Sequence, residues 1–428
     1  MASNGVKYDI QTLSNGLRIV LAPMPGTETA TVLVMTGTGS RYENEKENGL
    51  AHFLEHMFFK GTKKRSNAKA ISEELDGVGS EYNAFTAKER TAYHAKVSSK
   101  YLDTALDCVL DIFLNSKLPQ EEINKERGAI IQEINMYEDM PIRTINDVFE
   151  GLLFGRDAAL GRTILGPKAN ILSFSRQDFT TYLKRNYTPA NTVVCVAGSF
   201  SNPKVLAKIK KEFAHLTSGT LPAHQHFAFN QTAPRIEIKE KKTDQTQLML
   251  GVPAYPYLHK DEYALEVLSA ILGSGMSSRL FLEVREKRGL AYFVRGRTDK
   301  YPDVGYFVVQ AGVEHKNLEK TVLTILDEFK KIKRAAVSPK ELAKAKAHLK
   351  GGLALELETS DAIAENAATS LINLGKIRSI DELRKGIDKV TSADVQRIAE
   401  NIFKTESLNL AIIGPHLHKG ELLKLLHV

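Results

Sequence analysis

The two halves of this 428-residue chain share the same spacing of a helix and a following strand, and this repeat constrains the fold more than any other feature. In the first half, Asp178 opens a short helical segment, and the apolar run after it ends at Gly198. In the second half, Asp394 and Gly414 occupy the same places, so the separation is 20 residues in both copies (198 − 178 and 414 − 394). A repeat of about 200 residues is too long for a solenoid and predicts two similar domains.

The repeat places the domain boundary near the middle of the chain. Residues 217–234 combine Gly219 with two prolines and several polar residues, as a linker does. We therefore expect a first domain at 1–216 and a homologous second domain at 235–428. In each half, helices are mixed with strands joined by hairpins, which predicts an α+β fold with helices packed on a largely antiparallel sheet.

Composition argues against several functional classes. The formal net charge is +7, and the basic clusters are short and lack interleaved aromatic residues, unlike those of a nucleic-acid groove. We expect no membrane span and no secretory signal, because no apolar run is long enough and the N-terminal residues lack a basic segment followed by an apolar one. Cys108 and Cys195 lie in apolar contexts and are interpreted as free thiols in a reducing compartment. Walker-type and dinucleotide-binding glycine motifs are absent from the sequence.

Three ionisable residues interrupt an apolar helical run in the first half. Residues 49–59 read GLAHFLEHMFF, and a helix places His52, Glu55 and His56 within about 100° on one face. Burial of two imidazoles and a carboxylate among Phe, Leu and Met is costly unless partners satisfy them. A divalent cation would do so, because two imidazoles one turn apart can share one ion. Taken alone, the motif fits two satisfied core histidines and a salt-bridged glutamate equally well.

A catalytic zinc ion needs three protein ligands and one open position, so a third ligand is required. The predicted helix at 119–138 carries Glu126 and Glu133 two turns apart on one face. Exposed helices readily carry glutamates, but Glu133 stands among three isoleucines, where an apolar residue is expected. Two His-x-His pairs lack a third ligand and are interpreted as incidental: His224 with His226, and His416 with His418.

The order His-x-x-Glu-His inverts the commoner HExxH motif and is typical of the inverzincins. With this motif, the sequence resembles the pitrilysin family, which includes insulin-degrading enzyme and the mitochondrial processing peptidases. The resemblance spans both halves and implies one zinc ion per chain, held by His52, His56 and Glu133, which lies 77 residues beyond the second histidine (133 − 56). It also implies that Glu126 holds a ligating imidazole or the metal-bound water in place.

Two further segments match the family. Asn83-Ala84-Phe85-Thr86 is similar to an edge strand that binds extended substrate through its backbone; Asn83, Ala84 and Phe85 would contact the substrate, with Asn83 positioning its carbonyl. A glycine-rich run and the segment after it resemble the element in which an arginine and a tyrosine, here Arg285 and Tyr292, bind the developing oxyanion. Without the zinc motif, a turn asparagine, a solvated arginine and a packed tyrosine would be the simpler interpretations.

The resemblance implies a zinc-dependent endopeptidase that cleaves unfolded peptides or oligopeptides, with Glu55 as general base toward a metal-activated water. The implied fold is half of the clamshell of longer relatives, so we expect a homodimer in which Arg285 and Tyr292 act across the interface. We expect a prokaryotic cytoplasmic enzyme that acts on peptides and has neither nucleic-acid nor membrane partners. The alternatives are a non-catalytic peptide-binding or regulatory subunit, and a presequence-processing subunit that needs a second chain.

Overall fold

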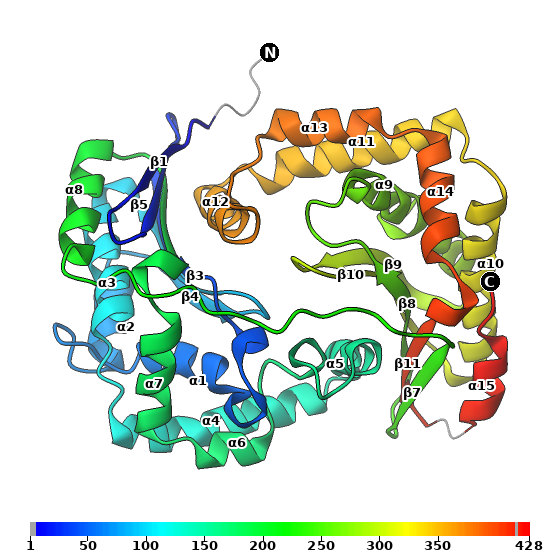
Figure 1. The fold of residues 1–428 in the computed structure, drawn as a ribbon, viewed down its shortest axis with the longest axis horizontal. Coiled ribbons are helices and arrows are strands. Elements are labelled where there is room, and N and C mark those ends of the chain that lie inside the picture. Colours follow the sequence, from blue (N-terminus) through cyan, green and yellow to red (C-terminus); the bar gives the residue numbers. More distant parts are fainter. Residues whose placement is uncertain (1–5, 416–417) are drawn as a thin grey trace. The chain divides into compact units, whose positions relative to one another are not determined.

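The chain forms two compact units, each built around one β-sheet (Figure 1). The computed structural model describes residues 6–415 and 418–428. The first unit comprises the chain up to Asn135, Arg162–Gln225 and Ala354–Arg378; the second comprises Met136–Gly161, His226–Leu353 and Ser379 to the C-terminus.

The sheet of the first unit has the strand order β1-β2-β6-β3-β5-β4 among the described residues. Its strands are β1 (Asp9–Thr12), β2 (Arg18–Pro23), β3 (Thr29–Thr36), β4 (Glu81–Thr86), β5 (Thr91–Ser98) and β6 (Thr192–Gly198). Neighbours pair antiparallel except β2 and β6, which are parallel. Since β4 pairs only with β5 among the described strands, its outer edge is open to another strand.

Alternation along β3 gives this sheet two apolar faces. Val32 and Val34 are fully buried on the face that packs against α1 (Leu50–Phe58) and α3 (Leu102–Asn115). On the opposite face, α12 (Ser360–Leu374) packs against β3 and β6, and its Ser360 hydroxyl lies 2.8 Å from that of Thr31. The remaining helices that begin in this unit are α2 (Ala68–Asp76), α4 (Gln120–Glu138), α6 (Lys168–Ser173), α7 (Arg176–Asn186) and α8 (Asn202–Phe213).

The second unit repeats this topology in its described residues, with the strand order β7-β11-β8-β10-β9. The strands are β7 (Arg235–Glu240), β8 (Thr246–Ala254), β9 (Ala291–Lys300), β10 (Gly305–Val313) and β11 (Asn409–Gly414). Again one neighbouring pair, β7 and β11, is parallel, and the others are antiparallel. The helices are α5 (Pro141–Phe154), α9 (Glu262–Gly273), α10 (Leu318–Arg334), α11 (Pro339–Glu356), α13 (Ile380–Lys389), α14 (Ser392–Ile402) and α15 (Lys419–Leu425).

Each sheet takes one covering helix from the other half of the sequence. Helix α5 precedes the predicted linker but packs against β7, β8 and β11, whereas α12 follows the linker but packs against β3 and β6. The compact units therefore differ from the contiguous segments 1–216 and 235–428, because each sheet needs an apolar helix on its second face. The two-domain α+β class is confirmed, and the boundaries of the repeat itself stay a prediction.

The repeated spacing has a local cause in helix capping. Asp178 and Asp394 are the third residues of α7 and α14, and each forms a reciprocal capping box with the hydroxyl residue that starts its helix. Gly198 and Gly414 end β6 and β11, the second strands of the matching parallel pairs. The same cap and the same strand thus recur at the same separation.

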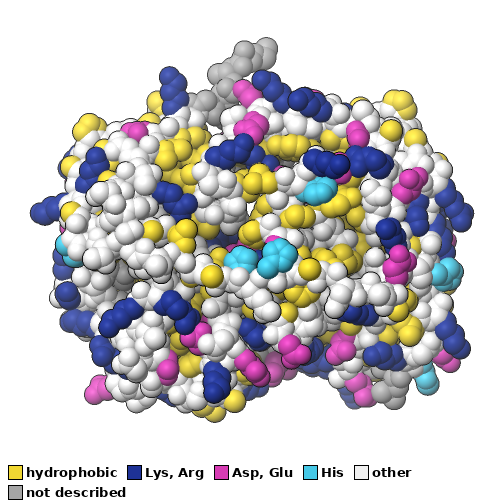
Figure 2. All heavy atoms as spheres, viewed as in Figure 1, with side chains coloured by type: hydrophobic (Ala, Val, Ile, Leu, Met, Phe, Trp, Pro, Cys, Tyr) yellow, Lys and Arg dark blue, Asp and Glu magenta, His cyan; other side chains and the backbone are white. Residues whose placement is uncertain are grey.

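Basic side chains, cysteines and helix hydropathy were the basis of the expectations from composition. Figure 2 shows Lys and Arg side chains scattered over the visible face rather than gathered into one basic stripe. Cys108 and Cys195 are both buried and free. None of the described helices is both long enough and apolar enough to cross a bilayer. The cytoplasmic location stays a prediction.

Candidate metal centre

Helix α1 presents the His-Phe-Leu-Glu-His motif with its apolar and ionisable residues on different sides. Phe53 and Leu54 are fully buried in the core of the first unit. His52 is also buried, whereas Glu55 and His56 are partly exposed. The helix is therefore anchored by its apolar residues, and its three ionisable groups lie near the boundary between core and solvent.

Glu133 extends from α4 to both imidazoles. Its Oε2 atom lies 3.5 Å from Nε2 of His52 and 3.4 Å from Nε2 of His56, and the two Nε2 atoms are 3.3 Å apart. Zinc bonds of about 2.05 Å at tetrahedral angles place ligand atoms about 3.3 Å from one another. The three donor atoms thus have the mutual separations that one tetrahedral ion requires, and one nitrogen-nitrogen-oxygen set of this kind suits zinc.

His52 also lacks another anchor. Its Nδ1 atom is buried and has no hydrogen-bond partner among the described residues. The imidazole is therefore held by packing and by the contacts of its other nitrogen, Nε2. It is Nε2 that faces the donor atoms of His56 and Glu133. His52, His56 and Glu133 form the group of potential metal ligands found among the described residues, and His416 lies outside them.

Glu126 holds His56 from the side away from the donor cluster. Its Oε1 atom lies 2.9 Å from Nδ1 of His56, and its Oε2 atom lies 2.6 Å from Nζ of Lys60. A proton on Nδ1 leaves Nε2 of His56 free to bind a metal ion. Burial raises the pKa of Glu126, but hydrogen bonds from His56 and Lys60 outweigh this and lower it, so the group stays a carboxylate. Glu126 therefore contacts the imidazole of His56, and its expected role at the site stays a prediction.

The electrostatics of the cluster favour a bound cation. Burial would lower the pKa of His56, but hydrogen bonds to Glu126 and Glu133 raise it to about 9. Hydrogen bonds from His52 and His56 hold the pKa of Glu133 well below its usual range. Two carboxylates around two imidazoles therefore require positive charge, which a proton or a divalent metal ion can supply.

Glu55 projects from the same helix toward the edge strand β4. Its Oε2 atom accepts a hydrogen bond of 2.6 Å from the hydroxyl of Thr86, the last residue of that strand. Thr86 is the last residue of the segment that resembles the substrate strand, and the sequence predicts no contact of its hydroxyl with Glu55. The contact fixes one carboxylate oxygen of Glu55 and leaves the other available.

The predicted substrate-binding residues lie on both faces of β4. Ala84 is buried on the face toward α1, whereas the side chains of Asn83 and Phe85 alternate to the opposite face. Asn83 is exposed, and its amide oxygen accepts a hydrogen bond of 2.9 Å from the backbone N–H of Ala84. The Asn83 side chain is thus turned back onto the backbone of its own strand.

Arg285 and Tyr292 form a pair within the second unit. Arg285 lies in a π-helical turn, Phe281–Glu286, and its guanidinium sits 5.3 Å from the ring centroid of Tyr292 and 4.9 Å from that of Phe281. Tyr292 is 77% exposed near the start of the edge strand β9. Stacking on two rings therefore orients the arginine, while the tyrosine hydroxyl is presented to solvent.

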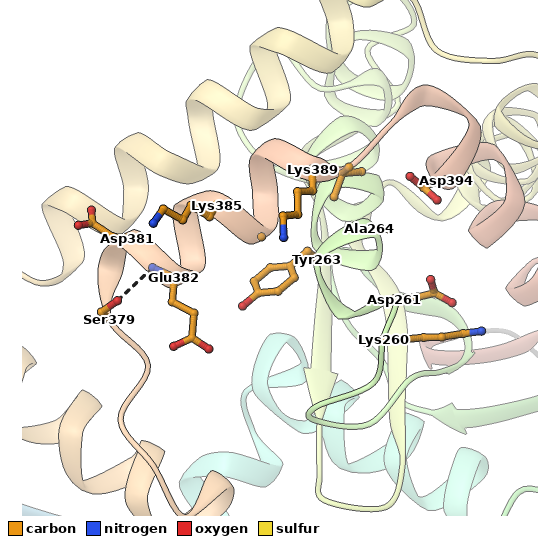
Figure 3. A pocket seen from close by; sticks show the side chains of 12 residues that line it. Lys260, Asp261, Tyr263, Ala264, Ser379, Asp381, Glu382, Lys385, Lys389 and Asp394 are labelled. Carbon is orange, nitrogen blue, oxygen red and sulfur yellow. Dashed lines mark hydrogen bonds between the residues drawn. The ribbon is translucent and has the colours of Figure 1, made fainter.

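A separate pocket of about 550 Å³ lies in the second unit between the start of α9 and α13 (Figure 3). Lysine and acidic side chains both line it, and two of the acids, Asp261 and Asp394, are already bound to Arg397. Ser379 accepts a hydrogen bond from the backbone N–H of Glu382 at the start of α13 (Figure 3). None of the predicted metal ligands or catalytic residues lines this pocket.

Comparison with known proteins places the chain in a family. Residues 18–168 match the model described as insulinase (peptidase family M16), and residues 173–349 match the peptidase M16 inactive domain. The chain is 37% identical to an uncharacterized zinc protease of Streptomyces coelicolor, over 94% of this chain and 89% of that protein. It is 36% identical to another of Bacillus subtilis, over 94% of this chain and 97% of that protein.

Solved structures share the fold along nearly the whole chain. A protease from Helicobacter pylori superposes with a TM-score of 0.88 at 26% identity, covering 96% of this chain and all of that one (100%). A peptidase M16 inactive domain from Pseudomonas fluorescens has the same TM-score of 0.88 at 18% identity, covering 96% of this chain and 98% of that one. At this low identity, the match is evidence for the fold and not for the function. With both family models matched and close relatives aligned over most of their length, the chain belongs to peptidase family M16.

Proposed function

We propose that this chain is a zinc-dependent endopeptidase that binds one zinc ion. The observation that carries this proposal is the mutual separation of three donor atoms from His52, His56 and Glu133, which matches the edges of a tetrahedral ligand set. The neighbouring carboxylate of Glu55 supplies the second requirement of metal-assisted hydrolysis, a base beside the ion. The names of the relatives, zinc proteases, point the same way.

The residues of the chain divide the reaction between them. When bound, zinc would polarise the scissile carbonyl and make a water molecule acidic near neutral pH. Glu55 takes a proton from that water as the water oxygen bonds to the carbonyl carbon. It then delivers the proton to the amide nitrogen as the carbon–nitrogen bond breaks, so one water yields one carboxyl and one amine. The Thr86 hydroxyl donates to one carboxylate oxygen of Glu55, and the other oxygen would take this proton.

The edge strand β4 supports extended peptides as the substrate class. Its outer backbone groups have no strand partner among the described residues, so a substrate backbone can add as the next strand. Backbone pairing grips any sequence, which fits an enzyme for unfolded peptides and oligopeptides. Asn83, Ala84 and Phe85 would then contact the substrate, after the Asn83 amide has turned away from the backbone of its own strand.

Arg285 and Tyr292 complete the proposal as oxyanion-binding residues. The exposed tyrosine hydroxyl and the stacked guanidinium are donors of the kind that stabilise a tetrahedral oxyanion. We assign them to the zinc site of a second copy, in a homodimer, as the family resemblance implies. Sedimentation or light scattering tests this assembly, and a fully active monomer would contradict it.

The alternative is a non-catalytic peptide-binding or regulatory subunit, or a presequence-processing subunit that needs a second chain. The match to an inactive-domain model covers residues 173–349, whereas the His-x-x-Glu-His motif lies at 52–56, inside the other match. The intact donor set therefore favours catalysis in the first unit.

Hydrolysis of a quenched fluorescent peptide library by zinc-loaded protein tests the function. Cleavage that is lost in Glu55→Gln and in the presence of a chelator would support the proposed peptidase and give its preferences. Zinc bound at one ion per chain without any cleavage would favour the peptide-binding alternative. Cleavage restored by adding a related chain would favour the two-chain processing enzyme.

A further inference from the structure

Helix α1 begins without a side-chain cap of its own. Its N-cap is Gly49, at φ = 102°, and a Cβ atom there would lie 2.7 Å from the carbonyl oxygen of Leu165. The first N–H groups of a helix need acceptors from outside it. Here they come from Glu43, whose two carboxylate oxygens accept hydrogen bonds of 2.9 Å from Gly49 and 2.6 Å from Ala51. The residue after Ala51 is the metal-ligand candidate His52.

Glu43 is itself fixed from several directions. It is buried, and the side-chain amide of Asn48 donates to its carboxylate at 3.1 Å and to the carbonyl of Thr163 at 2.9 Å. The guanidinium of Arg162 donates to the backbone carbonyl of Glu43 at 2.6 Å. These contacts hold the Glu43 side chain in one position, unlike a mobile side chain on the surface.

The segment around Glu43 also holds the turn that follows the edge strand β4. The backbone N–H groups of Ser40 and Arg41 donate to the carbonyls of Ala87 and Lys88 at 3.2 Å and 2.8 Å. Ala87 directly follows Thr86, the hydrogen-bond partner of Glu55. One short segment therefore ties together the start of α1 and the end of β4, the two elements that the Glu55–Thr86 bond joins.

We propose that Glu43 is a positioning residue, which sets the first turn of α1 and thereby places His52 and Glu55 relative to β4. This inference rests on the proposed zinc site. Glu43 acts through the backbone of Gly49 and Ala51 and touches neither the ion nor the substrate. Without its carboxylate, two N–H groups lose their acceptor, the first turn of α1 loosens, and His52 leaves the separation that zinc binding requires.

The test compares Glu43→Ala and Glu43→Gln with a matched loss of a helix cap, Asp178→Ala. Asp178 caps α7 in the same unit, where its carboxylate accepts a hydrogen bond of 2.7 Å from the N–H of Ser175. Three quantities are measured: zinc affinity by competition with a chromophoric chelator, the visible absorption of the cobalt-substituted protein, and the thermal midpoint of the metal-free protein.

Glu43→Ala is expected to weaken zinc affinity by about 10-fold or more and to change the cobalt spectrum, as loss of a group that orients a ligand does. Glu43→Gln should fall between wild type and alanine, because its amide oxygen keeps one acceptor. Asp178→Ala should lower the thermal midpoint while zinc affinity and the cobalt spectrum stay those of the wild type. If the alanine variant does not fold, the glutamine variant carries the comparison.

The outcomes separate this inference from the proposed function. A wild-type protein that binds no zinc rejects the metal site itself. A wild-type protein that binds zinc, together with a folded Glu43→Ala that binds it equally well, overturns the role of Glu43 alone. Equal losses of zinc affinity in Glu43→Ala and Asp178→Ala would show general destabilisation and would also overturn it.

Discussion

The two units place a charged helix beside their edge strand in the same way, yet they neutralise that charge differently. In the first unit, Glu55 of α1 accepts a hydrogen bond from Thr86 of β4. In the second unit, Glu266 of α9 accepts one of 2.8 Å from Thr298 of β9. In the second unit a lysine also pairs with this glutamate, because Nζ of Lys300 in β9 lies 2.6 Å from Glu266.

The charged partners of the carboxylates decide whether the same fold offers ligands to a metal ion. Lys300 also lies 3.1 Å from the buried Glu262, so this carboxylate and the partly exposed Glu266 share one cation from their own unit. In the first unit, Glu133 has two imidazoles as its partners, and imidazoles can release protons and bind a metal ion. A lysine partner in the second unit and two histidine partners in the first thus distinguish an ion pair within the chain from a candidate metal centre.

The largest expected effect comes from removing the base in one unit and its counterpart in the other. Glu55→Gln should lower peptide hydrolysis by about 10³-fold, because general-base catalysis is lost, while bound zinc is retained. Glu266→Gln, the matched variant in the second unit, should leave hydrolysis and zinc content unchanged. Rates on a quenched peptide and metal analysis of both variants decide this, and full activity in Glu55→Gln would remove Glu55 from the mechanism.

Next in size is the loss of a carboxylate from each cluster. Glu133→Ala should weaken zinc binding by more than about 100-fold, beyond the effect of groups that only orient ligands. Glu262→Ala should leave zinc affinity unchanged, because its partner is a lysine. Equilibrium competition with a chelator measures both, and an unchanged affinity in Glu133→Ala would exclude it as a ligand.

Removal of the Lys300 charge should lower the free energy of unfolding and leave zinc affinity unchanged. Lys300→Met removes the cation that Glu262 and Glu266 share, and breaking the buried pair of Lys300 and Glu262 costs about 3 kcal/mol. The triple variant that also carries Glu262→Gln and Glu266→Gln should recover much of this loss. Urea unfolding measures the free energies, and a loss of zinc affinity in Lys300→Met would contradict the separation of the two units' roles.

The smallest expected effect is on the pH dependence of stability, which should have opposite signs for the carboxyl groups at the starts of α1 and α9. Burial raises the pKa of Glu43 from 4.5 to about 7, although hydrogen bonds from Ala51 and Gly49 oppose this. Its contribution to stability is therefore full below about pH 4.5 and is lost as the pH rises through about 7. At the start of α9, a hydrogen bond from Arg397 lowers the pKa of Asp261, so that contribution is lost as the pH falls below about 3.8.

Urea midpoints between about pH 3 and pH 8 test this contrast. Glu43→Gln should flatten the decline toward neutral pH, and Asp261→Asn should flatten the decline toward acid pH. If Glu43→Gln keeps the wild-type profile at neutral pH, another group is responsible for that decline.

Local patterns made part of the site predictable from the sequence. The helical period placed His52 and His56 one turn apart, and Glu133 stood out as a carboxylate among isoleucines. Glu126 was expected from the family resemblance, but two further residues near the site, Glu43 and Lys60, were not predictable in this way. Glu43 lies in a charged stretch that is typical of an exposed loop, and Lys60 lies in a basic cluster that indicates a solvated face. Their roles depend on contacts across the tertiary structure, which residue type and spacing do not encode.

The fold was predictable to a similar depth. The repeated cap at Asp178 and Asp394 indicated two similar units because capping boxes are local. The exchange of α5 and α12 was not predictable, because an apolar helical stripe states that a helix is buried but not against which sheet.

The exchanged helices also bear on the order in which the chain can mature during synthesis. The strands β3 and β6 are complete once Gly198 has been made, but the helix that covers their second face ends at Leu374. Until then, one apolar face of the first sheet lacks its covering helix and is prone to aggregation. A fragment ending at 216 would keep this defect, because the helix that covers this face is made only with the second half of the chain.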